Sequence, residues 1–214
     1  MTTPSPRSAR DMSSFDANIA IEALLAHLNV PDWDVLITAD GSGQTWETAC
    51  GWAGVVVDRQ TRGRKLLYGG VSAGSNYLAE ALPFLHAMSW YDQSCGSGRL
   101  AKYGVQRVVM LTDSEALFRG MSSEHPSALK IIWGAWAEMR RLGYIIEPRW
   151  LRRSTIRLNV LVDAIAGKSR VLLRDMPDLA PTERAAYIRQ QLAELDVVDP
   201  VTAGPVEVEL INPF

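Results

Sequence analysis

Hydrophobic and polar positions follow a strand-like pattern in the first third of the chain and a mainly helical pattern later. Short apolar runs rich in β-branched residues predict five strands, over residues 35–39, 49–58, 65–71, 105–112 and 144–151. Apolar positions spaced three or four apart predict helices over residues 16–29, 76–91, 114–121, 126–142, 157–174 and 181–195. Pro83 predicts a kink or restart inside the second helix, and Gly96 with Gly98 predicts a loop after it.

The order of these elements is βββαβα(α)βα, preceded by an extra helix. Three strands joined by short turns predict an antiparallel meander, and the later alternation of strands and helices predicts parallel pairing. The sequence therefore predicts an α/β fold (an α+β mixed sheet) of five strands flanked by helices. We assign the domain to residues 35–174, with a tail and extra helix at 1–34 and a C-terminal helix and acidic tail at 175–214.

Composition narrows the class of protein. The chain has 214 residues, of which 47% are hydrophobic and 21% charged, which is enough for one core and excludes a disordered chain. Its two cysteines, Cys50 and Cys95, do not make a disulfide framework. No apolar run approaches the roughly 20 residues that span a bilayer, and residues 1–15 lack the apolar core of a signal peptide. We expect a cytoplasmic protein without membrane contact, and the sequence predicts no oligomeric state.

The formal net charge of −2 hides an uneven distribution. Residues 125–174 hold 10 Lys or Arg against three Asp or Glu, whereas the flanking segments are acidic. A basic block of this kind attracts phosphates through counterion release. The alternative is a solvated helix face, and charge alone favours neither interpretation.

Four carboxylates occupy positions from which they could meet. Asp40 ends the first predicted strand and Asp113 the fourth, so both leave the same sheet edge if those strands are parallel neighbours. Glu80 lies one turn into the first helix after the meander, and Asp163 lies in the last helix of the domain. Four converging carboxylates require cations, and oxygen ligands alone suit Mg²⁺ or Mn²⁺ better than Zn²⁺. The alternative for any single strand-end Asp is a turn or cap residue.

The motifs that carry these acids resemble type 1 ribonuclease H, within the ribonuclease H-like superfamily. The matching stretches are Ile37-Thr38-Ala39-Asp40-Gly41-Ser42, Asn76-Tyr77-Leu78-Ala79-Glu80, Leu111-Thr112-Asp113-Ser114, and Trp150 followed by Asn159-Val160-Leu161-Val162-Asp163. The resemblance implies a ribonuclease H-like fold over residues 35–174. It also implies an endoribonuclease that hydrolyses the RNA strand of RNA–DNA hybrids with two Mg²⁺ ions, for which Mn²⁺ can substitute.

The resemblance also implies a role for each acid. Asp40 would bridge both ions, Asp163 would complete the site of the ion that activates the attacking water, and Glu80 with Asp113 would hold the second ion. The same resemblance places Gly41, Ser42, Asn76 and Asn159 at the substrate. Ser75 corresponds to a position that contacts the DNA-strand phosphate, although a helix cap is the simpler interpretation.

The sequence departs from the family at the loop between the last strand and the last helix. That loop, residues 152–157, contains no histidine where family members commonly have one, and we expect slower turnover. Its Arg152 and Arg153 could instead hold the scissile phosphate. His125, before Pro126, is a weaker candidate for the missing group.

Three further features leave alternatives open. Tyr77 and Glu115 replace an asparagine and a glutamine that are frequent in the family, which weakens the prediction of strict hybrid selectivity. The alternatives are a non-catalytic ribonuclease H-like scaffold that binds nucleic acid or protein, and a DNA-cutting nuclease of the same superfamily. Trp133 and Trp136 either grip a DNA strand or, as their helical spacing favours, belong to the core.

The C-terminal tail carries a separate hypothesis. Leu210-Ile211-Asn212-Pro213-Phe214, behind two glutamates, is similar to the acidic, Pro-Phe-ending tails of bacterial single-stranded-DNA-binding proteins. That similarity predicts docking on a replication protein. The alternative, which we favour, is a strand packed on its own domain.

Overall fold

The computed structural model describes residues 21–44, 48–61, 63–123, 130–153, 155–195 and 207–210. At its centre lies one mixed sheet with the strand order β5-β4-β1-β2-β3-β6. The strands are β1 (Val35–Ser42), β2 (Thr48–Asp58), β3 (Arg64–Gly74), β4 (Gln106–Thr112), β5 (Tyr144–Trp150) and β6 (Glu207–Leu210). The five-stranded sheet predicted from the sequence is therefore confirmed, and β6 adds a sixth strand at its edge.

Strand pairing follows the predicted division of the sheet. β2 pairs antiparallel with both β1 and β3, as in a meander. β1 with β4, and β4 with β5, pair in parallel. β6 pairs in parallel with β3, from Lys65 opposite Glu207 to Tyr68 opposite Leu210. Residues 207–210 thus form a strand on the sheet. The favoured alternative for residues 210–214 is tested only at Leu210, because residues 211–214 lie outside the described part of the chain.

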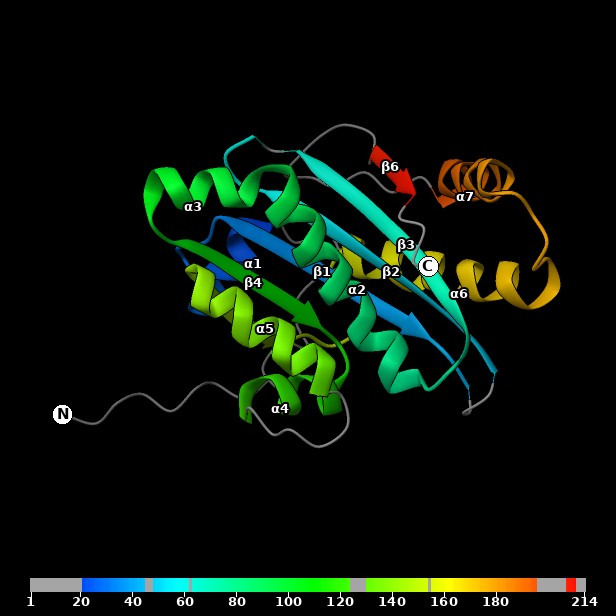
Figure 1. The fold of residues 1–214 in the computed structure, drawn as a ribbon, viewed down its shortest axis with the longest axis horizontal. Helices are drawn as coiled ribbons and strands as arrows, with labels where there is room; N and C mark the ends of the chain where they lie inside the picture. Colours follow the sequence, from blue (N-terminus) through cyan, green and yellow to red (C-terminus); the bar gives the residue numbers. More distant parts are fainter. Residues whose placement is uncertain are drawn as a thin grey trace.

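Helices cover both faces of the sheet. They are α1 (Ile21–His27), α2 (Asn76–Tyr91), α3 (Ser97–Tyr103), α4 (Glu115–Ser123), α5 (Lys130–Leu142), α6 (Arg157–Asp175) and α7 (Pro181–Leu195). Figure 1 shows α2, α3 and α5 in front of the sheet, and α1 and α6 behind it. The structure does not describe residues 124–129, which include His125, or the side chain of Trp133. Trp136 is 1% exposed and belongs to the core, as its helical spacing favoured.

The sheet separates two hydrophobic clusters. Alternate strand residues such as Leu36 and Val55 face α1, α6 and α7. Their neighbours, such as Ile37 and Val56, face α2, α4 and α5. Because α1 and α7 contribute buried side chains to the first cluster, the described parts of both predicted appendages share the core of the domain. Within the described residues, no helix has both the length and the apolar character needed to cross a bilayer.

The loop predicted at Gly96 and Gly98 is wrong. The chain continues from α2 through a π-helical segment (Asp92–Gly96) directly into α3. Gly96 is buried, and a Cβ there would lie 2.2 Å from the Tyr144 hydroxyl, so this glycine serves close packing and not a turn. The helical stretch ends instead at Gly104, whose φ of 83° suits glycine.

Pro83 does not restart the helix in which it lies. α2 is one continuous helix from Asn76 to Tyr91, with Pro83 buried at its middle. The proline packs on a glycine of the sheet: a Cβ at Gly54 would lie 3.3 Å from Pro83 Cβ. Pro83 thus lies against β2 within an uninterrupted helix.

Candidate active site

The first two carboxylates meet where β4 ends beside β1. β1 pairs in parallel with β4 only through Val35–Thr38. Carried two residues further, the same register places Asp40 beside Asp113, the first residue after β4. The strand predicted to end at Asp40 is longer, because β2 pairs with β1 as far as Ser42. Asp40 thus lies where β1 has lost one neighbour, the kind of opening at which α/β sheets bind ligands.

Glu80 reaches this opening from α2, on one face of the sheet. Ser75 caps the helix, and its hydroxyl accepts a hydrogen bond from Leu78 N at 3.1 Å. The first turn then packs on Gly41, where a Cβ would lie 2.3 Å from Glu80 N. Only glycine permits so close an approach. Gly41 therefore brings the backbone of β1 and α2 together and places Glu80 near Asp40.

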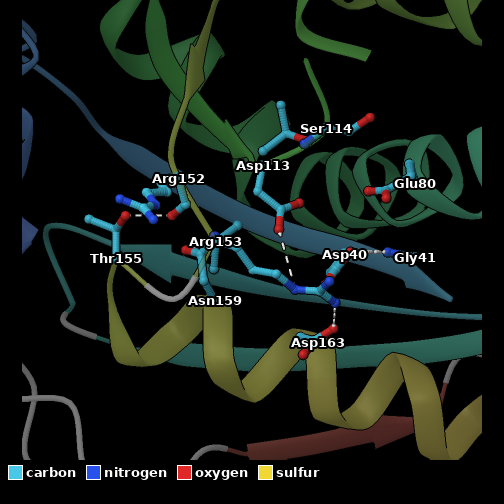
Figure 2. Close-up of polar contacts among 12 residues, drawn as sticks. Asp40, Gly41, Glu80, Asp113, Ser114, Arg152, Arg153, Thr155, Asn159 and Asp163 are labelled. Atoms are coloured by element: carbon cyan, nitrogen blue, oxygen red, sulfur yellow. Dashed lines mark hydrogen bonds and ion pairs between the residues drawn. The ribbon is translucent and has the colours of Figure 1, made fainter. Parts of the chain in front are cut away.

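Asp163 comes from α6, on the opposite face. Its side chain is 44% exposed and forms an ion pair with Arg153, from the loop between β5 and α6. Arg153 Nε also lies 3.9 Å from Asp113 Oδ2. Figure 2 shows the Arg153 guanidinium between these two carboxylates, with Asp40 close by.

All four predicted carboxylates open into one cavity of about 510 Å³. The residues that line it are Asp40, Gly41, Ser42, Gly43, Asn76, Glu80, Asp113, Ser114, Trp150, Arg153 and Asp163. Two of the acids come from the sheet: Asp40 from β1 and Asp113 from the residue after β4. Glu80 comes from α2 on one face of the sheet, and Asp163 comes from α6 on the other. The cavity is partly open to solvent.

Burial and like charges raise the pKa values of these carboxyls. The pKa of Asp40 rises to about 7, mainly through burial and then through the charges of Asp113 and Asp163. The pKa of Glu80 rises to about 9, mainly through burial and then through Asp40 and Asp113. Burial also raises the pKa of Asp113, although the charge of Arg153 opposes that rise. Carboxyls in such surroundings ionise readily only when a cation joins them.

Three of the carboxylates fit a divalent cation. One oxygen each from Asp40, Glu80 and Asp113 lies within 4.8 Å of the other two. Glu80 is 7% exposed, and its Oε2 has no hydrogen-bond partner among the described residues. A buried carboxylate oxygen without a partner requires a proton or a cation. A donor set of oxygens alone suits Mg²⁺ or Mn²⁺.

Asn76 connects the loop after β1 to this group. Its Oδ1 accepts a hydrogen bond from Gly43 N at 3.0 Å, and its Nδ2 donates to Glu80 Oε1 at 3.4 Å. Gly43, Asn76 and Glu80 all line the cavity. Asn76 therefore holds the Glu80 carboxylate in place while presenting part of its amide to the cavity.

The other predicted substrate contacts on this side divide into two groups. Gly41 and Ser42 line the cavity, and Gly41 N donates a hydrogen bond to Asp40 Oδ1 at 2.7 Å. Ser75 does not line it, and its hydroxyl is engaged in the cap of α2. The simpler interpretation of Ser75, a helix cap, is thus what the structure contains.

Arg152 and Asn159, also predicted to contact substrate, lie away from the cavity wall. Arg152 is exposed, and its carbonyl oxygen accepts a hydrogen bond from the Thr155 hydroxyl. Asn159 is 4% exposed, and its Oδ1 accepts a hydrogen bond from the Thr38 hydroxyl at 3.2 Å. Asn159 therefore joins α6 to β1 inside the core, because its position on α6 faces the sheet and not the cavity.

Tyr77 and Glu115, the two departures from the family that weakened the prediction of hybrid selectivity, do not line the cavity. Glu115 is 65% exposed and forms an ion pair with Arg119, four residues along α4, at 2.6 Å. It does not bring a fifth carboxylate into the cavity. Tyr77 packs against the hydrophobic cluster on the α2 face.

Trp150 and Ser114 line the cavity, although the sequence predicted no role for either. Trp150 pairs with Thr112 at the end of β5, and its Nε1 donates a hydrogen bond to Asp113 O at 3.0 Å. The indole thus fixes the backbone that carries Asp113. The available signal was the position of Trp150 at the end of the strand next to that of Asp113.

The strand order β3-β2-β1-β4-β5, with β2 antiparallel to both neighbours and β1, β4 and β5 parallel, is that of a ribonuclease H-like sheet. The chain has a ribonuclease H-like fold. Ribonuclease H-like chains of known structure that are similar to it include the N-terminal RNase H domain of rv2228c from Mycobacterium tuberculosis. That domain is 22% identical over 65% of this chain and 94% of its own, with a TM-score of 0.48.

Two further ribonuclease H structures are similar to a comparable degree. RNase H1 from Halobacterium salinarum NRC-1 is 16% identical over 63% of this chain and 96% of its own, with a TM-score of 0.47. LC11-RNase H1, isolated from compost by a metagenomic approach and solved in complex with an RNA/DNA hybrid, is 15% identical over 63% of this chain and 95% of its own, with a TM-score of 0.47. No family model and no curated protein sequence matches the chain.

Proposed function

We propose that this protein is a ribonuclease H: a metal-dependent endonuclease that hydrolyses the RNA strand of RNA–DNA hybrids. The observation that carries the proposal is the buried group of Asp40, Glu80 and Asp113, with one oxygen of each within 4.8 Å of the others. Asp163 lies on the wall of the same cavity. Such a concentration of acids is poorly explained by structure alone, because it raises carboxyl pKa values while no described residue gives Glu80 Oε2 a hydrogen-bond partner.

The residues divide into two ligand sets. Asp40, Glu80 and Asp113 would hold one divalent ion, and Asp40 with Asp163 would hold the second. Divalent ions bound there supply the charge that activates water and stabilises the leaving oxygen of a phosphodiester. The chain's own contribution is to hold the acids in place, through the Gly41 contact with α2 and the hydrogen bond from Asn76 to Glu80.

Recognition of the RNA strand is assigned to the wall formed by the end of β1 and the start of α2. Ser42 and Asn76 line the cavity next to Glu80, and both offer polar groups at hydrogen-bonding reach of a ribose entering there. The 2′-hydroxyl both donates and accepts, and it is the group that distinguishes RNA from DNA. We therefore propose selectivity for the hybrid over duplex DNA. We also propose that Arg153, from the loop between β5 and α6, contacts the phosphate backbone.

A cleavage assay with four labelled substrates tests the proposal. Wild-type protein with Mg²⁺ should cut the RNA strand of an RNA–DNA hybrid, leaving 5′-phosphate and 3′-hydroxyl ends, and a chelator should abolish cutting. Duplex DNA, duplex RNA and single-stranded RNA should be cut far more slowly. Cleavage of duplex DNA alone would instead favour a DNA-cutting nuclease, and intact substrates throughout would favour a binding scaffold.

Two variants separate this activity from a contaminating nuclease. Asp113→Asn removes a charge from the close acidic group and should lower hybrid cleavage by at least about a hundredfold, the scale of loss for an essential catalytic group. Glu115→Gln removes a charge two residues away that pairs with Arg119 outside the cavity, and should cut as wild type does. Equal cleavage by Asp113→Asn and wild type contradicts the proposal.

A further inference from the structure

The four acids of the cavity differ in whether the protein itself supplies a positive partner. Asp163 forms an ion pair with Arg153, and Arg153 Nε lies 3.9 Å from Asp113. Neither Asp40 nor Glu80 forms an ion pair with a lysine or arginine within the described residues. The cavity therefore has one side that carries its own cation and one side that does not.

The position and exposure of Arg153 allow its side chain both to contact Asp163 and to turn away from it. It belongs to the short loop between β5 and α6, and its side chain is 65% exposed. An arginine stem of this length and exposure can turn outward with little loss of packing. Its guanidinium presents several donors to the two carboxylates, and those carboxylates raise the pKa of Arg153, so its charge is permanent.

We propose that Arg153 is a tethered counter-ion that controls the second of two metal-binding steps. The first divalent ion binds to Asp40, Glu80 and Asp113, of which only Asp113 forms an ion pair with Arg153, a long one at 3.9 Å. The second ion, at Asp40 and Asp163, binds only as Arg153 withdraws from Asp163. This inference rests on the proposed metal-dependent function, and it adds an order of binding and the residue that sets it.

The competition follows from charge and geometry. Arg153 and a divalent ion at Asp163 would both require the oxygens that the carboxylate directs into the cavity, and two cations at this separation repel each other. The exposed ion pair is weak enough to break. A withdrawn guanidinium is then free to meet the phosphate backbone of a substrate, which links occupancy by the second ion to substrate contact.

Calorimetric titration with Mn²⁺ of the metal-free protein tests this order without measuring activity. Wild type should bind two ions with clearly different affinities. Arg153→Ala should strengthen the weaker step about fivefold, the upper range for loss of one exposed ion pair, and leave the tighter step within about twofold. Arg153→Gln should act in the same direction, because it keeps the side-chain bulk and removes only the charge.

Arg152→Ala is the matched control. It removes the same charge one residue away, from a side chain that does not line the cavity, so neither binding step should change by more than about twofold. An equal gain in Arg152→Ala and Arg153→Ala would assign the effect to general charge and overturn the inference. Unchanged or weaker binding in both Arg153 variants would overturn it as well.

The same titration distinguishes failure of the inference from failure of the function. Wild type that binds Mn²⁺ while the Arg153 variants match it leaves the proposed function standing and overturns the role of Arg153. No Mn²⁺ bound by wild type or by either Arg153 variant overturns the metal-dependent function, and the inference with it.

Discussion

The backbone of Gly41 in β1 lies directly against the backbone at Glu80 in α2. A Cβ on Gly41 would lie 2.3 Å from both Glu80 N and Ala79 C. Backbone atoms cannot yield as the end of a side chain can, so this contact fixes how near the helix comes to the strand. The distance between Asp40 and Glu80 depends on it, and so does the shape of the proposed metal site.

Gly41→Ala should therefore damage both the fold and the site. The added methyl group must push α2 away from β1, which we expect to lower the free energy of unfolding by about 1–3 kcal/mol, as over-packing does. It should also displace Glu80 and lower the rise in melting temperature produced by Mg²⁺. Urea unfolding and thermal unfolding with and without Mg²⁺ measure the two effects.

Gly98→Ala is the matched control for this substitution. Gly98 lies in α3, and a Cβ there meets no atom within 4 Å. Alanine should leave stability unchanged or raise it by about 0.5–1 kcal/mol through helix propensity. Equal effects of Gly41→Ala and Gly98→Ala would show that the Gly41 contact does not determine the site.

The raised pKa values of Asp40 and Glu80 predict a stability that declines with pH when no metal is present. Their pKa values rise from 3.8 to about 7 and from 4.5 to about 9 in the folded protein. Folding therefore favours the protonated forms, and this contribution is fully present below about pH 4 and lost as pH rises through 7 toward 9. The free energy of unfolding in chelator should fall across that range, and added Mg²⁺ should restore it most at the alkaline end.

Glu80→Gln isolates the larger of these two contributions. Glutamine has nearly the same shape and does not ionise, so the decline in stability should become shallower and end near pH 7. The variant should also be more stable than wild type in chelator at pH 8, and Mg²⁺ should stabilise it less. Parallel pH profiles for the two proteins would contradict the assignment of the decline to Glu80.

Ser75 offers a choice between a helix cap and a substrate contact. Because its hydroxyl accepts from Leu78 N, Ser75→Ala should lower the free energy of unfolding by about 1 kcal/mol. Ser75→Thr keeps an accepting oxygen and should restore most of that loss. Affinity for hybrid, measured by fluorescence anisotropy at a temperature where all three proteins are folded, should be the same. A tenfold loss of hybrid affinity in Ser75→Ala would instead favour the substrate contact.

The buried hydrogen bond between Thr38 and Asn159 predicts coupled effects on stability. Asn159→Leu leaves the Thr38 hydroxyl buried without its acceptor and should cost about 1–3 kcal/mol. Thr38→Val should cost a similar amount by leaving the amide unpaired. The double variant should lose less than the sum of the two, since both polar groups are then gone. Strict additivity in urea unfolding would contradict this role for Asn159.

The sheet and the meeting of the acids follow from local sequence signals. Buried apolar runs followed by Asp40 and Asp113 specify which acids lie side by side at one edge of the sheet, once parallel pairing is assumed. The helical spacing around Glu80 and Asp163 then places both acids within reach of that edge. These signals depend on the alternation of hydrophobic and polar residues in strands and on the helical spacing of apolar residues, both of which can be read from a single sequence.

Other features depend on contacts between distant residues, which periodicity does not encode. Gly96 resembles a loop glycine in sequence, but the ring of Tyr91 and the hydroxyl of Tyr144, 48 positions later, pack against it within a helical stretch. Glu115 follows Asp113 closely, yet its side chain is exposed and pairs with Arg119 along α4. Arg153 was predicted to meet a phosphate, and its pairing with Asp163 depends on how the loop after β5 lies against α6.

Crystals of the metal-free protein soaked in Mn²⁺ test the central claim most directly, through anomalous diffraction at the manganese edge. We predict a peak at coordination distance, about 2.0–2.3 Å, from one oxygen each of Asp40, Glu80 and Asp113. The peak should vanish in Asp40→Asn crystals prepared in the same way. A wild-type map with no anomalous density among these three side chains would contradict the account.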